Sequence, residues 1–273
     1  MAKVIAICNQ KGGTGKTTTA INLSTYLSIQ GRKVLLIDLD PQGNSTSGLG
    51  IEKSSLKGTI YDVLINNFDV TSSLVKSCVD RLQVIPSDIN LIGAELELAD
   101  SPLREKNLLV IIDSIRQDYD YIIIDAPPSL GFLTLNALVA CDSVIIPVQC
   151  EYFALEGLGQ LLKTINLIKE RFNQKLEIEG VLLTMADFRT NLTTEVINET
   201  RNFFKDKVFR TIIPRSIRLS EAPGFGKPIY FYDRASIGAD KYDELAREVT
   251  ANEIEQRVEK QPPAPSDNLT QAV

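Results

Sequence analysis

The sequence is organised around the stretch Gln10-Lys11-Gly12-Gly13-Thr14-Gly15-Lys16-Thr17-Thr18. An apolar run, KVIAICN (3–9), precedes it, and a helical pattern over residues 17–30 follows it. A glycine-rich turn between a strand and a helix lets successive backbone N–H groups face phosphate oxygens, and the helix adds its positive N-terminal end. The stretch therefore predicts a phosphate-binding loop. The alternative is a tight strand-to-helix turn without a ligand.

The final Lys-Thr pair fits the P-loop pattern, which assigns a role to each of the two residues. Lys16 is expected to reach the β- and γ-phosphates, and the Thr17 hydroxyl is expected to bind Mg²⁺. We expect the whole loop to contact ATP through Lys11, Gly12, Gly13, Thr14, Gly15, Lys16, Thr17 and Thr18.

The loop departs from the ordinary P-loop pattern at its start. Gln10 stands where that pattern has glycine, and Lys11 adds a second lysine beside Gly12 and Gly13. Because Lys16 already serves the terminal phosphates, Lys11 could project outward to the phosphates of a partner subunit, as an arginine finger does. It would then couple dimerisation to ATP. The alternative for Lys11 is a solvated surface lysine.

Apolar β-branched runs recur outward from the loop and alternate with helical patterns over 17–30, 103–117, 153–172, 191–205 and near 238–258. Continuous apolar strands indicate a sheet that is covered on both faces. We therefore predict an α/β fold, a doubly wound, mostly parallel sheet with helices on both faces, in one domain over residues 1–258. Residues 259–273 are proline-rich and polar and are expected to be disordered. The expected strands are KVIAICN (3–9), RKVLLIDL (32–39), LQVIPS (82–87), YDYIIIDA (119–126), DSVIIPVQ (142–149), EIEGVLLTM (177–185) and KVFRTIIP (207–214).

Composition excludes several classes of chemistry. The chain has no histidine, which removes imidazole bases and His-ligated metal sites. Its four cysteines form no CxxC pair, so buried reduced thiols are expected rather than a disulfide or metal framework. No signal peptide and no run of about 18 apolar residues occurs, which favours a cytoplasmic protein. The net charge of -6 excludes a uniformly basic nucleic-acid binder.

Several segments together resemble one family. The segments KGGTGKTTTAINLSTYLS (11–28), VLLIDLDPQGN (34–44) and YIIIDAPPSLG (121–131) resemble the deviant Walker A, switch I and Walker B segments of the ParA/Soj partition ATPases. EGVLLTMADFRT (179–190) and IPRSIRLSEAPGFGKPI (213–229) extend the resemblance over about residues 2–255, within the wider ParA/MinD group. The resemblance implies a P-loop NTPase fold and a homodimer that sandwiches ATP between its subunits.

Three aspartates follow two of the apolar runs. Asp38 and Asp40 lie two residues apart, so on a strand both would point to the same side of the carboxyl edge. The resemblance implies that Asp40 orients or deprotonates the attacking water and that Asp38 supports the Mg²⁺ shell. Asp125 fits the Walker B role of holding Mg²⁺ through water. The alternative is that these strand-end aspartates cap helices or turns.

Adenine recognition depends more on the resemblance. It implies that Met185, Pro214, Arg215 and Ser216 line the base. Met185 could equally be a core residue, and Ser216 stands where many relatives carry asparagine.

A local basic cluster offsets the negative total. Between residues 201 and 218 the chain has six basic residues and one acidic residue, Asp206. Such cations suit non-specific binding of double-stranded DNA, and a dimer doubles them; the alternative is a solvated helix face. The resemblance implies that Arg189 and Arg218 contact DNA, that the protein is nucleoid-associated, and that a ParB-type protein stimulates an otherwise slow hydrolysis. The six basic residues are Arg201, Lys205, Lys207, Arg210, Arg215 and Arg218.

Three other functions share the loop. A membrane-positioning ATPase like MinD would need a basic amphipathic C-terminal helix, whereas residues 243–273 are acidic and lack aromatic residues. A reductase of the nitrogenase iron-protein type would need cluster-binding cysteines, and APPSLGFL (126–133) contains none. A biosynthetic ligase that phosphorylates a carboxylate would hydrolyse ATP only with a small substrate. We therefore expect no membrane attachment.

Overall fold

The fold is built on one central seven-stranded sheet, with strand order β3-β4-β2-β5-β1-β6-β7. A computed structural model describes residues 1–99, 102–152 and 158–259. All paired neighbours are parallel except β3, which runs antiparallel to β4. The strands are β1 (Lys3–Ile7), β2 (Val34–Asp38), β3 (Val75–Lys76), β4 (Leu82–Ile85), β5 (Tyr121–Asp125), β6 (Ser143–Gln149) and β7 (Glu177–Thr184).

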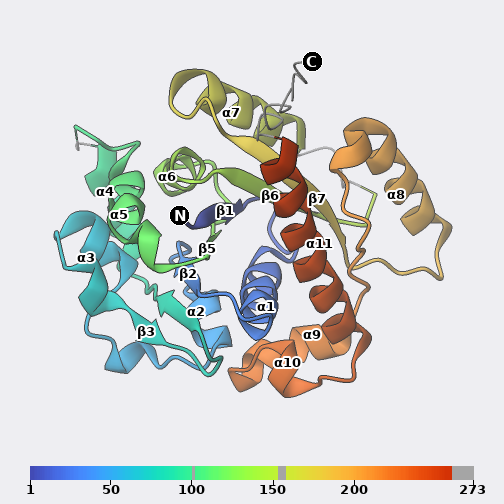
Figure 1. The fold of residues 1–273 in the computed structure, drawn as a ribbon, viewed down its shortest axis with the longest axis horizontal. Helices are drawn as coiled ribbons and strands as arrows, with labels where there is room; N and C mark the ends of the chain where they lie inside the picture. Colours follow the sequence, from blue (N-terminus) through green and yellow to red (C-terminus); the bar gives the residue numbers. More distant parts are fainter. Residues whose placement is uncertain (100–101, 153–157, 260–273) are drawn as a thin grey trace, which may run out of the picture.

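Helices cover both faces of this sheet (Figure 1). Alternate residues along each strand enter different cores, as period-two geometry requires: Val4 packs with one set of helices and Ile5 with the other. The first set comprises α3 (Ile60–Ile65), α4 (Leu91–Ala99), α5 (Asn107–Ile115), α6 (Phe132–Ala140), α7 (Leu158–Arg171) and α8 (Asn191–Phe204). The opposite face holds α1 (Lys16–Ile29) beside α11 (Ile237–Glu259), with α2 (Asn44–Gly48), α9 (Ile217–Glu221) and α10 (Ile229–Tyr232) nearby.

The predicted doubly wound, mostly parallel sheet is confirmed, and six of the seven expected strands are present. The seventh, residues 207–214, is wrong: only Val208 and Pro214 form isolated bridges there. The backbone N–H groups of Arg210 and Thr211 donate instead to the carboxylate of Glu248 on α11, at 2.7 and 3.1 Å. Phe209 and Ile213 still donate backbone hydrogen bonds to Val181 and Leu183 of β7, so a side chain from a distant helix interrupts the strand pairing that the apolar pattern favoured.

Smaller differences concern ends and edges. The antiparallel edge strand β3 was not expected, and α5 begins at Asn107 rather than at residue 103. Cys78 is exposed, whereas Cys8, Cys141 and Cys150 are buried as expected. The predicted disordered tail covers residues 259–273; Glu259 is the last residue of α11, and residues 260–273 lie outside the described residues, as does the expected helical start at 153–157.

The strand register brings the functional segments together. Asp125 at the end of β5 is paired with Ile7 of β1 on one side and with Asp38 of β2 on the other. Because parallel strands end at the same edge, the glycine-rich loop after β1 meets both aspartates there.

Candidate functional site

The loop between β1 and α1 has the backbone that an anion cradle needs. Gly13 and Gly15 adopt positive φ angles of 74° and 87°, a left-handed region that favours glycine. Gly15 is the N-cap of α1 and offers no capping side chain, and the first turn of α1 has no acidic residue. The N–H groups and the positive end of α1 therefore face the loop interior.

Lys16 lies inside this loop rather than in solvent. Its side chain is buried, and its ammonium donates to the backbone carbonyl of Lys11 at 3.1 Å. Burial lowers the pKa of Lys16, while the nearby Asp125 and Asp40 carboxylates act in the opposite direction. The predicted phosphate lysine and two of the predicted aspartates are thus neighbours.

Asp38 and Asp125 form a pair of fully buried carboxylates. Burial raises the pKa of Asp125 to about 7, and the charge of Asp38 adds to this effect. Burial likewise raises the pKa of Asp38 to about 6, although hydrogen bonds from Thr46 act against the increase. Two adjacent carboxylates in a low-dielectric site repel one another unless a cation lies between them.

The oxygens of Asp125 suit a divalent cation. Oδ2 accepts a hydrogen bond from the Ser45 hydroxyl at 2.7 Å, whereas Oδ1 is buried without a partner among the described residues. The nearby Thr17 side chain also acts to lower the pKa of this carboxylate. In the part of the chain that the structure describes, no three His, Cys, Asp or Glu side chains form a complete metal cage. That arrangement fits Mg²⁺, which takes one or two carboxylates and completes its shell with waters and substrate phosphates.

Asp40 lies in a turn beyond the end of β2, so the period-two argument for its direction does not apply. It is nevertheless buried, and its Oδ1 accepts a hydrogen bond from the backbone of Gln42 at 2.9 Å. Its charge acts on both Lys16 and Asp125, so it belongs to the same site.

Ser45 and Thr46 were missed by sequence reasoning. Besides the Ser45 contact with Asp125, the backbone N–H and hydroxyl of Thr46 donate to Asp38 Oδ2 at 2.8 and 2.7 Å. Thr46 Oγ1 also accepts a hydrogen bond from the backbone N–H of Ser87 at 3.0 Å. These hydroxyls therefore tie the Asp40 turn to the strand ends. Their position directly after a turn rich in Gly and Asn was the available signal.

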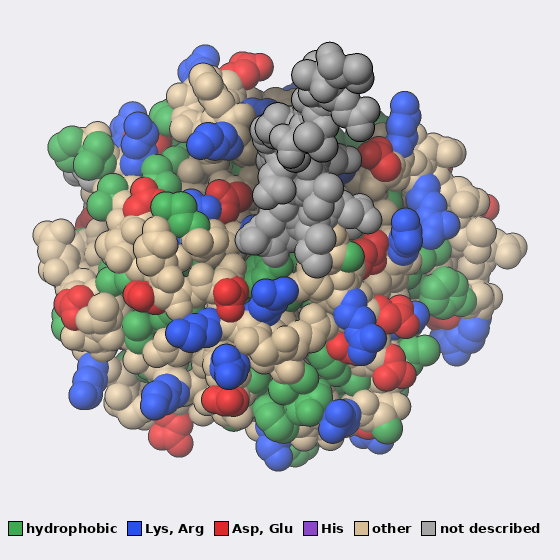
Figure 2. All heavy atoms as spheres, in the orientation of Figure 1, with side chains coloured by type: hydrophobic (Ala, Val, Ile, Leu, Met, Phe, Trp, Pro, Cys, Tyr) green, Lys and Arg blue, Asp and Glu red, His purple; other side chains and the backbone are tan. Residues whose placement is uncertain are grey.

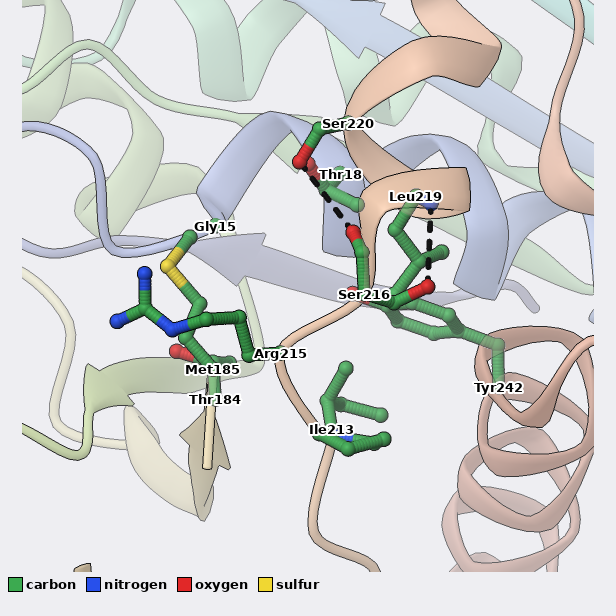
Figure 3. Close-up of a pocket in the computed structure, with 11 residues that line it drawn as sticks. Gly15, Thr18, Thr184, Met185, Ile213, Arg215, Ser216, Leu219, Ser220 and Tyr242 are labelled. Carbon is green, nitrogen blue, oxygen red and sulfur yellow. Dashed lines mark hydrogen bonds between the residues drawn. The ribbon is translucent and has the colours of Figure 1, made fainter. Parts of the chain in front are cut away.

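The four residues expected at the base lie in one pocket beside Gly15 and Thr18. Its volume is about 100 Å³, and the Met185 side chain reaches toward Gly15 while Arg215 extends beside it (Figure 3). Ser216 caps α9, its hydroxyl accepting from the Leu219 backbone at 3.4 Å. The pocket brings together Met185, Pro214, Arg215 and Ser216, with Thr184, Leu219 and Tyr242 as further lining residues that the sequence did not reveal.

The two arginines expected to contact DNA are exposed but paired. Arg189 makes a two-pronged contact with Asp187, its Nε at 2.8 Å and its Nη2 at 2.7 Å. Arg218 lies 3.1 Å from Glu221 and 3.4 Å from Asp233. The six basic residues between 201 and 218 are all exposed. In Figure 2 basic and acidic side chains are interspersed, and several basic ones gather near α8.

Comparison with known proteins shows to which family this chain is related. A family described as "AAA domain" matches residues 2–178. The chain is 57% identical over 252 residues to the sporulation initiation inhibitor protein Soj of Bacillus subtilis, covering 92% of this chain and 100% of that protein. It is 52% identical to the chromosome partitioning protein ParA of Myxococcus xanthus, over 91% of this chain and 88% of that protein. The chain belongs to the ParA/Soj family.

A solved structure shows the same fold as this ParA/Soj family member. It is titled cobyrinic acid a,c-diamide synthase from Mycobacterium smegmatis, with bound ADP and magnesium. The two have a TM-score of 0.83 and 36% identity, over 94% of this chain and 97% of that one. Within the described residues, no helix combines the length and apolar character that crossing a bilayer requires.

Proposed function

We propose that this ParA/Soj family member is an Mg²⁺-dependent ATPase whose ATP-bound form is a homodimer that binds double-stranded DNA without sequence preference. It acts in chromosome or plasmid segregation, at the nucleoid in the cytoplasm, with a ParB-type protein that stimulates hydrolysis. The observation that carries the proposal is the meeting of buried Lys16 with Asp125 and Asp40 at one glycine-rich loop.

The residues divide the chemistry among themselves. The loop N–H groups and Lys16 hold the phosphates, while Thr17, Asp38 and Asp125 hold Mg²⁺, whose charge offsets that of the phosphates. Asp40 accepts a proton from water as the water oxygen bonds to the γ-phosphorus and the bond to the β–γ bridging oxygen breaks. Residues around Met185 and Ser216 enclose the base. The structure of the ADP- and magnesium-bound neighbour supports this ligand pair.

Lys11 is available for a partner subunit. Its backbone is fixed, because its N–H donates to Asn9 Oδ1 at 3.0 Å and its carbonyl accepts from Lys16. Among the described residues its ammonium makes no hydrogen bond or ion pair. In the proposed dimer this ammonium reaches the phosphates held by the other subunit, so hydrolysis is slow until two subunits close.

The proposal is tested by light scattering and DNA binding with Mg²⁺ and ATP. Asp40→Ala is expected to remain a DNA-bound dimer, because ATP persists. Lys11→Ala is expected to stay a monomer that does not bind DNA, and Lys33→Ala, an exposed lysine, serves as its control. A parent protein that stays monomeric with a non-hydrolysable ATP analogue contradicts the proposal.

The structural similarity to a protein named as a diamide synthase favours a second candidate, an amide-forming ligase. Such an enzyme hydrolyses ATP in response to a small carboxylate substrate. Hydrolysis that rises with DNA and a ParB-type protein, and not with a small carboxylic acid, separates the two functions. The opposite dependence would favour the ligase.

A further inference from the structure

An apolar groove of about 470 Å³ lies beside the candidate site. One side is formed by Pro41, in the turn that carries the water-positioning aspartate, and by Pro127, in the loop after β5. The other side is α4, through Ile92 and Leu96. The turn that follows β2 and the loop that follows β5 therefore both form part of the groove wall.

The helix that forms this groove is apolar on two sides. Leu91, Ala94 and Leu98 of α4 are buried in the core, whereas Ile92 and Leu96 are 55% and 77% exposed. α4 lies at the periphery of the molecule (Figure 1). Apolar side chains that line an exposed groove mark an interaction surface rather than an ordinary solvated face.

The helix that lines the groove, α4, and the residues just before it are acidic. Residues 88–99 contain Asp88, Glu95 and Glu97 and no lysine or arginine. Glu97 is exposed and accepts a hydrogen bond from the Tyr61 hydroxyl at 2.9 Å. Among the described residues, neither Glu95 nor Glu97 forms an ion pair. A cationic segment with apolar side chains complements this surface.

Glu95 links the groove to the loop after Asp125. Its carboxylate caps α6 by accepting from the backbone N–H groups of Phe132 and Leu133, at 3.1 and 3.4 Å. It packs against Gly131, where an added Cβ would lie only 2.3 Å from Glu95 Oε1. A shift of α4 therefore moves the end of the loop that begins at the Walker B aspartate.

We propose that this groove, formed by Pro41, Pro127, Ile92 and Leu96 and flanked by Glu95 and Glu97, docks a short cationic segment with apolar side chains. That segment belongs to the stimulating partner, so the inference rests on the proposed function. Docking shifts α4 and, through Glu95, the loops that position Asp40 and Asp125. A second copy of this chain is the alternative occupant, and the measurement of dimerisation distinguishes it from the partner's segment.

The test uses labelled synthetic peptides that copy each short segment of the ParB-type protein from the same organism that combines basic and apolar residues. Binding is measured by fluorescence anisotropy, and stimulation by ATP hydrolysis with DNA present. Leu96→Lys/Glu97→Lys is expected to weaken peptide binding at least about tenfold and to abolish stimulation. Basal hydrolysis, ATP-dependent dimerisation and DNA binding stay at the parent's level.

The matched control is Val110→Lys/Asp113→Lys on α5, which makes the same two changes at exposed positions outside the groove. It is expected to bind the peptide as the parent does. A peptide with its basic residues changed to glutamate is expected to bind the Leu96→Lys/Glu97→Lys protein better than the parent. Ile92→Ser, which leaves charge unchanged, provides a second variant with the same expected loss.

Three results would overturn the inference. Undiminished peptide binding and stimulation in both groove variants would exclude the groove. Loss of ATP-dependent dimerisation with peptide binding intact would show that the groove joins two copies of this chain. A parent protein that neither binds the peptide nor responds to the ParB-type protein removes the proposed function itself, and this inference with it.

Discussion

The two charged regions of this protein use charge in opposite ways. At the carboxyl edge of the sheet, Lys16, Asp38 and Asp125 are buried, and each pKa departs from its ordinary value because of burial. Along residues 185–234, Arg189 and Arg218 are exposed and held by acidic neighbours. A buried charge interacts strongly with the few charged groups beside it. An exposed charge is screened by solvent and salt, and the effects of several such charges add. Single substitutions should therefore be severe in the first region and graded in the second.

The largest effect is expected for Lys16→Ala. Removing a positioned, buried cation from a phosphoryl-transfer site costs about 10²–10³ in rate. Single-turnover hydrolysis with saturating Mg²⁺ and ATP measures it. Lys33→Ala should hydrolyse ATP like the parent, and a loss of less than about tenfold in Lys16→Ala would remove Lys16 from the chemistry.

Asp125→Asn is expected to change the pH dependence of stability. Because the folded-state pKa values of Asp125 and Asp38 are raised to about 7 and about 6, ionisation disfavours the folded state. In the ligand-free protein, the contribution of these two groups to the free energy of unfolding is therefore fully present below about pH 4 and is lost as the pH rises to about 7. At pH 8 Asp125→Asn should unfold at a higher temperature than the parent, and at pH 4 the two should coincide.

Thermal unfolding followed by circular dichroism checks this prediction. Asp113→Asn, at an exposed position on α5, removes the same charge and should leave the parent's pH profile unchanged. Mg²⁺ with ATP should stabilise the parent more than Asp125→Asn at pH 8, because the cation offsets the two carboxylates. An Asp125→Asn protein that is less stable than the parent at pH 8 would contradict the assignment.

Arg189→Glu/Arg218→Glu is expected to weaken binding of double-stranded DNA by at least about tenfold at moderate salt. Each phosphate contact that is lost should reduce the log–log salt slope by about 0.9. Titrations at several salt concentrations measure both quantities. Lys163→Glu/Lys169→Glu, at two exposed positions of α7, is the matched control, and an equal loss in that variant would make the effect one of total charge.

The smallest effect is expected for Asp187→Asn. Hydrogen bonds from Arg189 lower the pKa of Asp187 to about 2, so this carboxylate competes with DNA phosphates at every practical pH. Its removal should tighten DNA binding about two- to fivefold, as suits an exposed ion pair. Asp206→Asn removes an exposed carboxylate beyond the other end of α8 and should give a smaller gain. Equal gains in the two variants would mean that Asp187 does not restrain Arg189.

The features that could be predicted from the sequence are those that depend on residues close together in the chain. The glycine loop, Lys16 and the strand-end Asp125 follow from local patterns, and the alternation of apolar runs predicts the covered sheet. The strand predicted at 207–214 is interrupted because Glu248, on a distant helix, accepts the N–H groups of Arg210 and Thr211. The tethering by Ser45 and Thr46, the place of Tyr242 in the proposed base pocket and the groove on α4 likewise depend on contacts between distant segments, which no local pattern records.

One hydrogen bond joins the proposed base pocket to the proposed phosphate loop. The Thr184 hydroxyl, at the end of β7 and in the wall of that pocket, donates to the backbone carbonyl of Thr14 in the glycine-rich loop at 2.9 Å. We therefore expect a nucleoside triphosphate whose base does not fit the pocket to be held less firmly at its phosphates. Selectivity among nucleotides should consequently show itself in turnover as well as in affinity.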